Sequence, residues 1–340
     1  MNRPHGPPGL KTARASAHSN IALCKYWGKR EGATPGLNLP ATGSLSLTLD
    51  ALYTQTEVAA GTDDRFELDG RALVDDAARK VFAHLDLLWR TAGNSGARPA
   101  AHVRSTNHLP TAAGLASSAS GFAALTLAGM AAFGGALDRG PLAALARMGS
   151  GSAARSLWGG FVRLDRGNRP DGADCVARPL FGQDHWDVRL VVVQTAAGRK
   201  PIGSTAGMER SRLTSPYYGA WVEGSEADLE RAQTALAARD LTALGAVVEH
   251  SCFKMHACML ASSPPFSYWN GTTMEVTRAV WSERAAGLEG YATIDAGPHV
   301  KVLCAAADAP RWVERLGAVA GVVAVQTCAP GPDAHVEVVA

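Results

Sequence analysis

The sequence carries almost no net charge. Its 33 lysine and arginine residues nearly balance 31 aspartate and glutamate residues, which leaves a formal charge of +2 over 340 residues. A chain with so little excess charge has no basic face strong enough to predict binding to nucleic acid. A small anionic ligand is compatible with this composition, because a few cations gathered at one place suffice to bind it.

Paired cysteines are also absent. The six cysteines are scattered, without a C-x-x-C pair and without a spacing to histidine that is typical of a metal site. Cys252 and Cys258 lie on either side of His256, but the second pair of ligands that a zinc site needs is missing. Scattered free thiols are typical of a reducing compartment, so we expect a cytoplasmic protein with no metal site by direct motif.

The chain contains no stretch typical of a targeting signal or a membrane span. Residues 1–11 are rich in proline and glycine and lack an apolar core, so we expect no signal peptide, and we expect 1–14 to be mobile. Residues 112–135 carry no charge, but alanine, glycine and serine predominate there over leucine, isoleucine and valine. This composition favours a buried helix and predicts no membrane partner.

Helical and extended patterns are interleaved along the chain. Residues 44–50 alternate strictly between polar and apolar, which predicts a strand, and the apolar positions 78, 81, 82, 85 and 88 share one face of a helix over 75–90. Further strands are predicted at 15–27, 53–60, 65–68, 101–105, 188–193, 300–305, 322–326 and 337–339. Further helices are predicted at 116–133, 141–148, 205–215, 226–239, 241–260, 272–286 and 310–316, with another beginning at 153–158. Such interleaving is typical of a mixed α/β (α+β) class.

A polar stretch over 163–185 separates two groups of predicted elements. We therefore place a domain boundary near its end. The expected organisation is a mobile N-terminal segment at 1–14, an N-terminal domain at 15–187 and a C-terminal domain at 188–340.

A loop rich in glycine, alanine and serine joins a predicted strand to a predicted helix over 110–121. Small side chains let backbone N–H groups approach a ligand, and the N-terminus of a helix carries a partial positive charge, so the segment suits phosphate. Ser117, Ser118 and Ser120 add hydroxyls for phosphate or a divalent cation. The loop lacks the Gly-Lys-Ser/Thr of a Walker A motif. The alternative is a helix that needs small side chains only for packing.

Two other segments gather cations. The small-residue loop 149–155 ends in Arg155, and arginine suits a bidentate grip on carboxylate or phosphate; a helix junction with a solvated arginine is the alternative. Lys25, Lys29 and Arg30 follow the first apolar strand beside two aromatic residues. A lysine at the end of a buried strand needs an anionic partner if its side chain points inward.

A late carboxylate, Asp295, follows a strand-like run and precedes the small residues Ala296 and Gly297, then Pro298. Small residues let another group come close to the carboxylate, and the Gly-Pro step turns the chain. Taken alone, an aspartate before a turn is more often a residue that caps the turn.

Together these segments resemble the diphosphomevalonate decarboxylase family of the GHMP kinase superfamily. The resemblance spans roughly residues 16–302 and rests on four motifs in the family's order. They are Ile21-Ala-Leu-Cys-Lys-Tyr-Trp-Gly-Lys29, Pro110-Thr-Ala-Ala-Gly-Leu-Ala-Ser-Ser-Ala-Ser-Gly-Phe-Ala123, Gly149-Ser-Gly-Ser-Ala-Ala-Arg-Ser-Leu-Trp-Gly-Gly160 and Asp295-Ala-Gly-Pro298. The resemblance implies an N-terminal half like ribosomal protein S5 domain 2, a ferredoxin-like C-terminal half and an active site in the cleft between them. It also implies ATP as cosubstrate, Mg²⁺ and a homodimer.

The implied reaction converts ATP and 5-diphosphomevalonate into isopentenyl diphosphate, through phosphorylation of the C3 hydroxyl, loss of phosphate and release of CO₂. In this resemblance Asp295 acts as base, Lys25 lies near it, and Arg155 holds the substrate carboxylate. The implied substrate-binding residues are Tyr26, Trp27, Gly28, Lys29, Arg79, Ser150, Gly151, Ser152, Ala153, Ala154, Arg155 and Thr205. The implied ATP-binding residues are Pro110, Ala113, Gly114, Leu115, Ala116, Ser117, Ser118 and Ser120, and Ser118 is also a candidate ligand for Mg²⁺ arriving with ATP.

The sequence departs from the family's pattern at three places. His299 stands where the family usually has asparagine, Thr42-Gly43 replaces a more polar pair, and Ala154 replaces a cysteine. His299 is either a hydrogen-bonding group near the chemistry or only a turn residue. The alternatives left open are a decarboxylase or 3-kinase acting on mevalonate 5-phosphate or mevalonate, and a non-catalytic nucleotide-binding relative.

Overall fold

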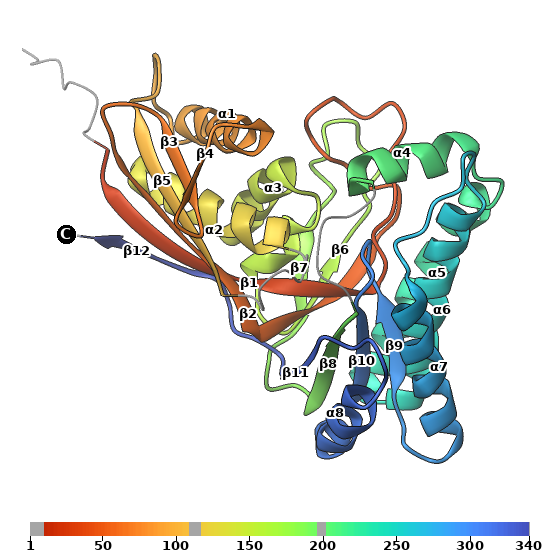
Figure 1. Ribbon diagram of the computed structural model, residues 1–340. Coiled ribbons are helices and arrows are strands. Elements are labelled where there is room, and N and C mark those ends of the chain that lie inside the picture. Colours follow the sequence, from red (N-terminus) through yellow and green to blue (C-terminus); the bar gives the residue numbers. More distant parts are fainter. Residues whose placement is uncertain (1–9, 109–116, 196–201, 340) are drawn as a thin grey trace, which may run out of the picture.

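The computed structural model describes residues 10–108, 117–195 and 202–339, which are organised by two β-sheets (Figure 1). The strands of the first sheet are β1 (Thr12–Cys24), β2 (Ser44–Ala60), β3 (Arg65–Leu68), β4 (Arg71–Leu73), β5 (Ala101–His108), β6 (Phe161–Leu164), β7 (Ala177–Phe181) and β12 (His335–Val339). Those of the second are β8 (Val188–Gln194), β9 (Tyr291–Ile294), β10 (Val300–Ala305) and β11 (Ala324–Cys328). The helices are α1 (Asp76–Thr91), α2 (Ser117–Ala132), α3 (Arg139–Gly149), α4 (Ser204–Thr214), α5 (Tyr218–Ala238), α6 (Leu241–Leu260), α7 (Gly271–Ala285) and α8 (Ala309–Gly317), with the 3₁₀ turns η1 (Ala153–Leu157) and η2 (Ala306–Asp308).

The first sheet has the strand order β12-β1-β2-β5-β3-β4, with β6 beside β2 and β7 beside β6. Its long strands β1 and β2 run antiparallel over most of their length. The late strand β12 returns to this sheet and pairs antiparallel with β1. The first sheet therefore contains segments from both ends of the described chain, and the structure has the mixed α/β class that the element pattern predicts.

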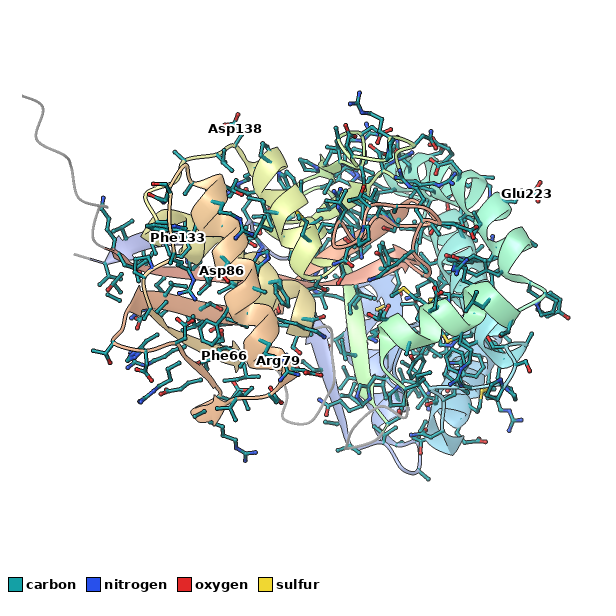
Figure 2. All side chains as sticks on the ribbon, turned by 90° about the horizontal axis from the view of Figure 1, so that it is seen from above. Phe66, Arg79, Asp86, Phe133, Asp138 and Glu223 are labelled. Carbon is teal, nitrogen blue, oxygen red and sulfur yellow. The ribbon has the colours of Figure 1, made fainter. Side chains whose placement is uncertain are left out.

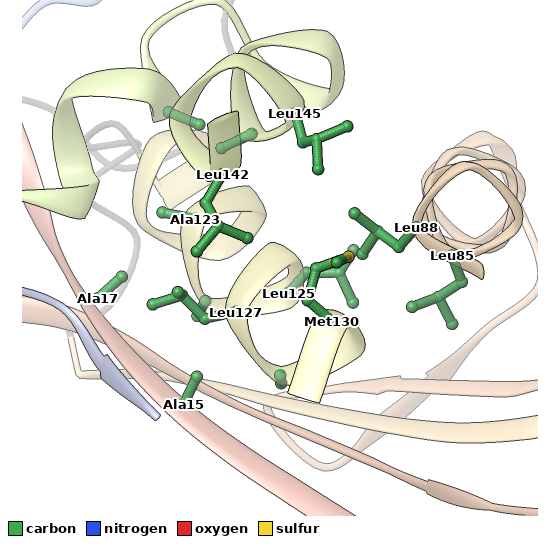
Figure 3. Close-up of a cluster of buried hydrophobic side chains, with 14 of the residues drawn as sticks. Ala15, Ala17, Leu85, Leu88, Ala123, Leu125, Leu127, Met130, Leu142 and Leu145 are labelled. Atoms are coloured by element: carbon green, nitrogen blue, oxygen red, sulfur yellow. The ribbon is translucent and has the colours of Figure 1, made fainter. Parts of the chain in front are cut away.

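Helices α1, α2 and α3 pack over one face of the first sheet (Figure 1). Their leucines and methionine share one buried cluster with small alanines of β1, and Figure 3 shows Leu127 of α2 on the side of Ala15 and Ala17. Helix α2 is apolar on all sides, which is typical of a buried helix. A Cβ at Gly129 would lie 2.7 Å from Leu88, so the missing side chain lets α1 and α2 approach closely. The described part of the uncharged stretch therefore contains a core helix, α2, and no helix of the described residues is long and apolar enough to cross a membrane.

The second sheet has the strand order β11-β8-β10-β9 and is covered on both faces. On one face, Leu190 and Val192 of β8 join a core cluster with α5, α6, β1 and β2. On the other face, Val191 and Val193 pack with residues of α7 and α8. Burial on both faces explains why residues 190–193 of β8 form a continuous apolar run. The cluster shared with β1 and β2 joins the second sheet to the first.

Most predicted elements agree with the structure to within a few residues, and three differences have local causes. The strands predicted at 44–50 and 53–60 form one strand, β2, because pairing with β1 continues past an irregularity in register between His18 and Asn20. Strands β6 and β7 overlap the polar stretch 163–185, where polar side chains hid the extended pattern. The helix expected to begin at 153 is only the short turn η1.

The domain division at 187/188 stays a prediction. Residues 1–9 and 109–116, which include most of the expected mobile segment and most of the expected phosphate loop, lie outside the described residues. Thr12 and Arg14, which belong to the segment expected to be mobile, lie in β1 and pair with β12.

Candidate active site

A pocket of about 370 Å³ brings together residues from distant parts of the chain. The end of β1 and the loop after it form one wall, and the turn between β9 and β10 forms another. The segment between α3 and η1, the starts of α2 and α4, and single residues of α1, α6 and the loop before β2 also line it. Residues of all four motifs thus meet in one cavity, although Lys25 and Asp295 are 270 positions apart in the chain.

The carboxylate of Asp295 is held by two buried lysines. Strand β9 ends at Ile294, so Asp295 begins the turn, which Gly297 closes by donating its N–H to the Asp295 carbonyl at 2.7 Å. Lys25 Nζ lies 2.8 Å from Oδ1, and Lys301 Nζ lies 2.9 Å from Oδ2. The lysine side chains are only 1% and 3% exposed, whereas the Asp295 side chain is 30% exposed, so the carboxylate is the accessible member of the group.

This arrangement fixes the charge of Asp295. Burial alone would raise the pKa of its carboxyl group, but the charges of Lys25 and Lys301 and their hydrogen bonds outweigh burial and hold that pKa well below its usual range. Burial also lowers the pKa of Lys301, and Asp295 opposes that effect. The acid is therefore an anion at neutral pH, within a group that carries one negative and two positive charges.

Arg155 lies in the same pocket with its side chain fixed. It is 1% exposed; it donates to Ser44 Oγ at 2.6 Å and, through Nε and a terminal nitrogen, to Asn20 Oδ1 at 3.3 and 3.2 Å. Asn20 is itself held, because its amide donates to Ser156 Oγ at 2.7 Å. Burial lowers the pKa of Arg155 to about 10, although Tyr26 and Asp295 oppose that shift. The guanidinium is thus a preorganised cation whose named hydrogen-bond partners are neutral oxygens.

Two further lysines face the pocket near its rim. Lys29 donates to Asn38 Oδ1 at 2.6 Å, and the Asn38 amide is anchored on the Met148 carbonyl at 2.7 Å. Burial lowers the pKa of Lys29, and the charge of Lys80 lowers it further. Lys80, which is exposed, lines the same pocket from α1. Two cations that repel each other across a pocket suit an anion with more than one charge.

Hydroxyls and a close backbone approach complete this side of the pocket. Ser150 Oγ lies 3.4 Å from Ser118 Oγ, at the first turn of α2, and 3.5 Å from Ser152 Oγ. A Cβ at Gly151 would lie 2.3 Å from the Tyr26 hydroxyl oxygen, so only glycine fits between the loop and that ring. Ser118 stands where the N-terminus of α2 offers a partial positive charge. These groups can bind phosphate oxygens.

The pocket gathers most, but not all, of the residues implied by the resemblance. Lining it are Lys25, Tyr26, Trp27, Lys29, Ser118, Ser150, Gly151, Ser152, Arg155, Thr205 and Asp295. Outside the lining are Gly28, Arg79, Ser117, Ser120, Ala153 and Ala154. Pro110, Ala113, Gly114, Leu115 and Ala116 lie outside the described residues.

The structure does not bring Arg79 or Ser120 to the pocket. The Arg79 side chain, labelled in Figure 2, is 73% exposed on α1. It pairs with Asp76 one turn earlier, and the next residue, Lys80, faces the pocket instead. The Ser120 hydroxyl is fully buried and bonds Thr54 at 2.8 Å and Ser19 at 3.2 Å, so it joins α2 to the first sheet. Ala153 and Ala154 are buried in the hydrophobic cluster that α1, α2 and α3 form against the first sheet.

Among the polar residues of the site that sequence reasoning missed are Asn20, Asn38, Lys80 and Lys301. A signal existed for Lys301, because a lysine inside an apolar strand needs a partner, which is the argument already applied to Lys25. Asn38 has a left-handed backbone with φ of 51°, which is typical of a loop asparagine and carries no signal of function. The other two are ordinary polar residues on a strand and a helix.

His299 lines the pocket with 4% of its surface exposed. The backbone N–H of Thr195 donates to His299 Nδ1 at 3.2 Å, which requires that nitrogen to be unprotonated. His299 therefore helps to fix the turn against β8 while it also forms part of the pocket wall. This position is compatible with either of the two roles expected for it.

The pocket's hydroxyl oxygens suit a metal that arrives with a phosphate ligand. No group of three or more His, Cys, Asp or Glu residues within 10–108, 117–195 and 202–339 could hold a metal ion by itself. Ser118, Ser150 and Ser152 instead offer hydroxyl oxygens, the kind of ligand that Mg²⁺ accepts alongside phosphate. A site completed by a nucleotide fits these residues.

Comparisons with known proteins agree with this geometry. Residues 17–177 match the diphosphomevalonate decarboxylase-like N-terminal domain, and residues 189–331 match the mevalonate 5-diphosphate decarboxylase C-terminal domain. The chain is 36% identical to diphosphomevalonate decarboxylase of Rattus norvegicus over 308 residues, which cover 84% of this chain and 75% of the relative.

Solved structures extend the similarity over nearly the whole chain. Mevalonate diphosphate decarboxylase from Staphylococcus aureus superposes with a TM-score of 0.88 at 34% identity, covering 96% of this chain and 98% of the other. A structure of MDDEF in complex with MVAPP, AMPPCP and magnesium has the same TM-score at 35% identity, covering 97% and 99%. With sequence and structure in agreement over both halves, this chain belongs to the diphosphomevalonate decarboxylase family and has the GHMP kinase fold.

Proposed function

We propose that this protein catalyses the ATP-dependent decarboxylation of 5-diphosphomevalonate to isopentenyl diphosphate. ATP phosphorylates the C3 hydroxyl, the phosphate then leaves, and CO₂ departs as the alkene forms. The observation that carries this proposal is the presence of an anionic, accessible Asp295 and a buried Arg155 in one pocket, which Lys29 and Lys80 also line. A substrate with a hydroxyl, a carboxylate and a diphosphate matches these groups in kind.

Asp295 receives the proton of the C3 hydroxyl as the γ-phosphoryl group of ATP transfers. An oriented carboxylate in this role contributes roughly 10²–10⁴-fold. Phosphoryl transfer otherwise depends on positioning and on neutralisation of charge. Lys25, held at 2.8 Å from Asp295, supplies positive charge where the transferred group arrives.

Arg155 holds the substrate carboxylate through the second phase of the reaction. Positive charge builds at C3 when phosphate leaves, and the carboxylate then collapses to CO₂. A guanidinium that is 1% exposed and fixed by Asn20 and Ser44 keeps the carboxylate in place with little water around it. Its orientation is set before the substrate arrives, which reduces the entropy lost on binding.

The substrate diphosphate binds at the opposite rim. The groups available to the diphosphate are hydroxyls, the close backbone approach at Gly151 and the ammonium group of Lys29. The hydroxyls belong to Tyr26, Ser150, Ser152 and Thr205. Lys80 adds a second positive charge on the same side. The ATP phosphates bind at the first turn of α2, where Ser118 faces the pocket and its hydroxyl can join the phosphate oxygens around Mg²⁺.

The protein acts in the cytoplasm as a homodimer with two domains, 15–187 and 188–340. All six cysteines are free thiols, which supports a reducing compartment. Two separate family matches, one on each side of residue 188, support the domain division. The homodimer rests on the resemblance to the family, and size-exclusion chromatography with light scattering tests it.

A coupled assay of ADP release, run with mevalonate, its 5-phosphate and its 5-diphosphate, tests the function. We expect turnover with the diphosphate only, with one phosphate and one CO₂ released for each ADP. Turnover with the monophosphate, or ADP release without CO₂, would replace the proposal with a related kinase or decarboxylase. Binding of ATP without turnover on any of the three would point to a non-catalytic relative.

A further inference from the structure

Lys301 holds the second oxygen of the proposed catalytic acid. It lies on β10, which is paired with β8 on one side and β9 on the other, so Val192 and Thr293 flank it in the sheet. Its Nζ contacts Asp295 Oδ2 at 2.9 Å and the His299 carbonyl oxygen at 3.3 Å. Because its strand is central in the four-stranded sheet, the ammonium group has a fixed place under the pocket.

The two lysines are not equivalent in position. Lys25 approaches from the end of β1 and also bonds the Ala22 carbonyl at 2.8 Å, whereas Lys301 approaches from the second sheet. Each takes one carboxylate oxygen, so the plane of the carboxylate is defined from both halves of the fold. Removal of either lysine leaves one oxygen free to rotate toward solvent, since the Asp295 side chain is 30% exposed.

The single negative charge of Asp295 has two lysine partners. The second buried lysine adds a positive charge that the local carboxylate does not neutralise. An uncompensated buried charge is costly unless an anion binds beside it. The anion that the proposed function places there is the phosphoryl group in transfer.

We propose that Lys301 is a positioning residue that aims Asp295 by holding Oδ2 and supplies the excess positive charge that the transferred phosphoryl group meets. The inference rests on the proposed function, because it assigns Lys301 a part in the same phosphoryl transfer. Lys301 orients Asp295 through its contact with Oδ2, and its ammonium charge adds to that of Lys25.

Other titratable groups face Asp295 from several elements of the fold. Lys25 faces it from β1, Arg155 from η1, His299 from the turn, and Cys252 and His256 from α6. Burial lowers the pKa of His256 to about 3 and raises the pKa of Cys252 to about 11, so neither carries charge near neutral pH. Within the described residues, the cations that bear on Asp295 are therefore its two lysines and Arg155, and only the lysines hydrogen-bond to its carboxylate.

The test is Lys301→Met, a neutral replacement of similar length, measured as kcat and KM for both substrates. We expect kcat to fall at least about tenfold while KM for ATP stays within about threefold, because the missing contact acts on the group in transfer. Lys301→Gln keeps a hydrogen-bond donor without the charge, so its kcat should lie between those of the wild type and Lys301→Met. In an Asp295→Asn background the change to Met should cost clearly less than in the wild type, because the part of its effect that acts through that acid is already lost.

Lys254→Met is the matched control, because Lys254 pairs with the buried Asp228 away from the pocket. It should lower the melting temperature without changing kcat. If Lys301→Met does not fold, Lys301→Gln alone carries the test. A KM for ATP that rises as much as kcat falls, or losses that multiply fully with those of Asp295→Asn, would overturn the assignment of Lys301. An inactive wild-type enzyme would instead refute the proposed function.

Discussion

At Asp295 the side chain is anionic, accessible and oriented before any ligand binds, which is an unusual combination for a carboxylate whose two lysine partners are buried. Such a low-pKa acid is a weak base, so its main contribution is to orient the hydroxyl and take the proton late, as the phosphoryl group moves. A carboxamide at this position keeps the shape but loses the charge and the proton acceptor.

Asp295→Asn should therefore lower kcat by roughly 10³-fold or more while ATP still binds. Turnover from the ADP assay and nucleotide affinity from calorimetry check this. Asp187→Asn is the control, because Asp187 lies on the surface with its side chain 78% exposed and should leave kcat unchanged. Near-normal turnover of Asp295→Asn would remove this residue from its proposed role.

Arg155→Gln should raise KM for the acid substrate and also lower kcat, because the carboxylate loses its charged partner in binding and in departure. The buried oxygens of Asn20 and Ser44 lose donors as well, which costs about 1–3 kcal/mol of unfolding free energy. Arg163→Gln is a matched control, since Arg163 is a largely buried arginine that pairs with Asp165 outside the pocket. Unchanged KM and kcat in Arg155→Gln would refute the carboxylate clamp.

At the scale of elements, the loop after β1 owes its path to glycine. Gly28 has a φ of 101°, and a Cβ there would lie 2.0 Å from the Tyr218 hydroxyl oxygen of α5. The resemblance implies Gly28 as a substrate residue, yet it lies outside the pocket lining and sets how β1, the Lys29 loop and α5 meet. A small residue can thus belong to a functional motif for reasons of packing.

Gly28→Ala and Gly36→Ala separate backbone strain from crowding. Both glycines have positive φ, but a Cβ at Gly36 meets nothing within 4 Å. We expect Gly36→Ala to lose about 1–2 kcal/mol of unfolding free energy from strain alone. Gly28→Ala should lose more and should raise KM for the diphosphate substrate, because the displaced loop carries Lys29. Equal losses in urea titrations of the two variants would contradict the crowding at Gly28.

At the scale of the whole molecule, each half of the fold contains a buried histidine that joins two elements. His84 of α1 lies 2.9 Å from Thr126 Oγ1 of α2, and burial lowers its pKa to about 4. His256 of α6 lies 3.2 Å from the Ile294 carbonyl oxygen of β9, and burial lowers its pKa to about 3. Both are neutral in the folded protein at pH values where the unfolded chain binds a proton.

The contribution of these histidines to the free energy of unfolding should be fully present above about pH 6.5 and fall as pH decreases toward 4. Each contributes at most about 1.4 kcal/mol per pH unit, because the unfolded state takes up one more proton. Urea titrations at about pH 7, 6 and 5 measure the slope. His84→Gln should reduce the slope, whereas His108→Gln, at an exposed position of β5, should not. A slope that is the same in all three proteins would contradict the role of His84.

The sequence by itself determined the mixed α/β class, most strands and helices, and the residue types of the site. It did so because period-two and helical patterns of apolar residues, small-residue loops and isolated cations are local properties of the chain. It also placed Lys25, Arg155 and Asp295 in motifs whose order resembles one family.

Only the tertiary structure decided which side chains share the pocket. Lys80 lines it where Arg79 does not, Ser118 faces it where Ser120 is buried in packing, and Lys301 takes the second oxygen of Asp295. The physical reason is that these placements depend on how α1, α2, the end of β1 and the turn between β9 and β10 pack around one cavity. That meeting joins residues 270 positions apart, which no local pattern encodes.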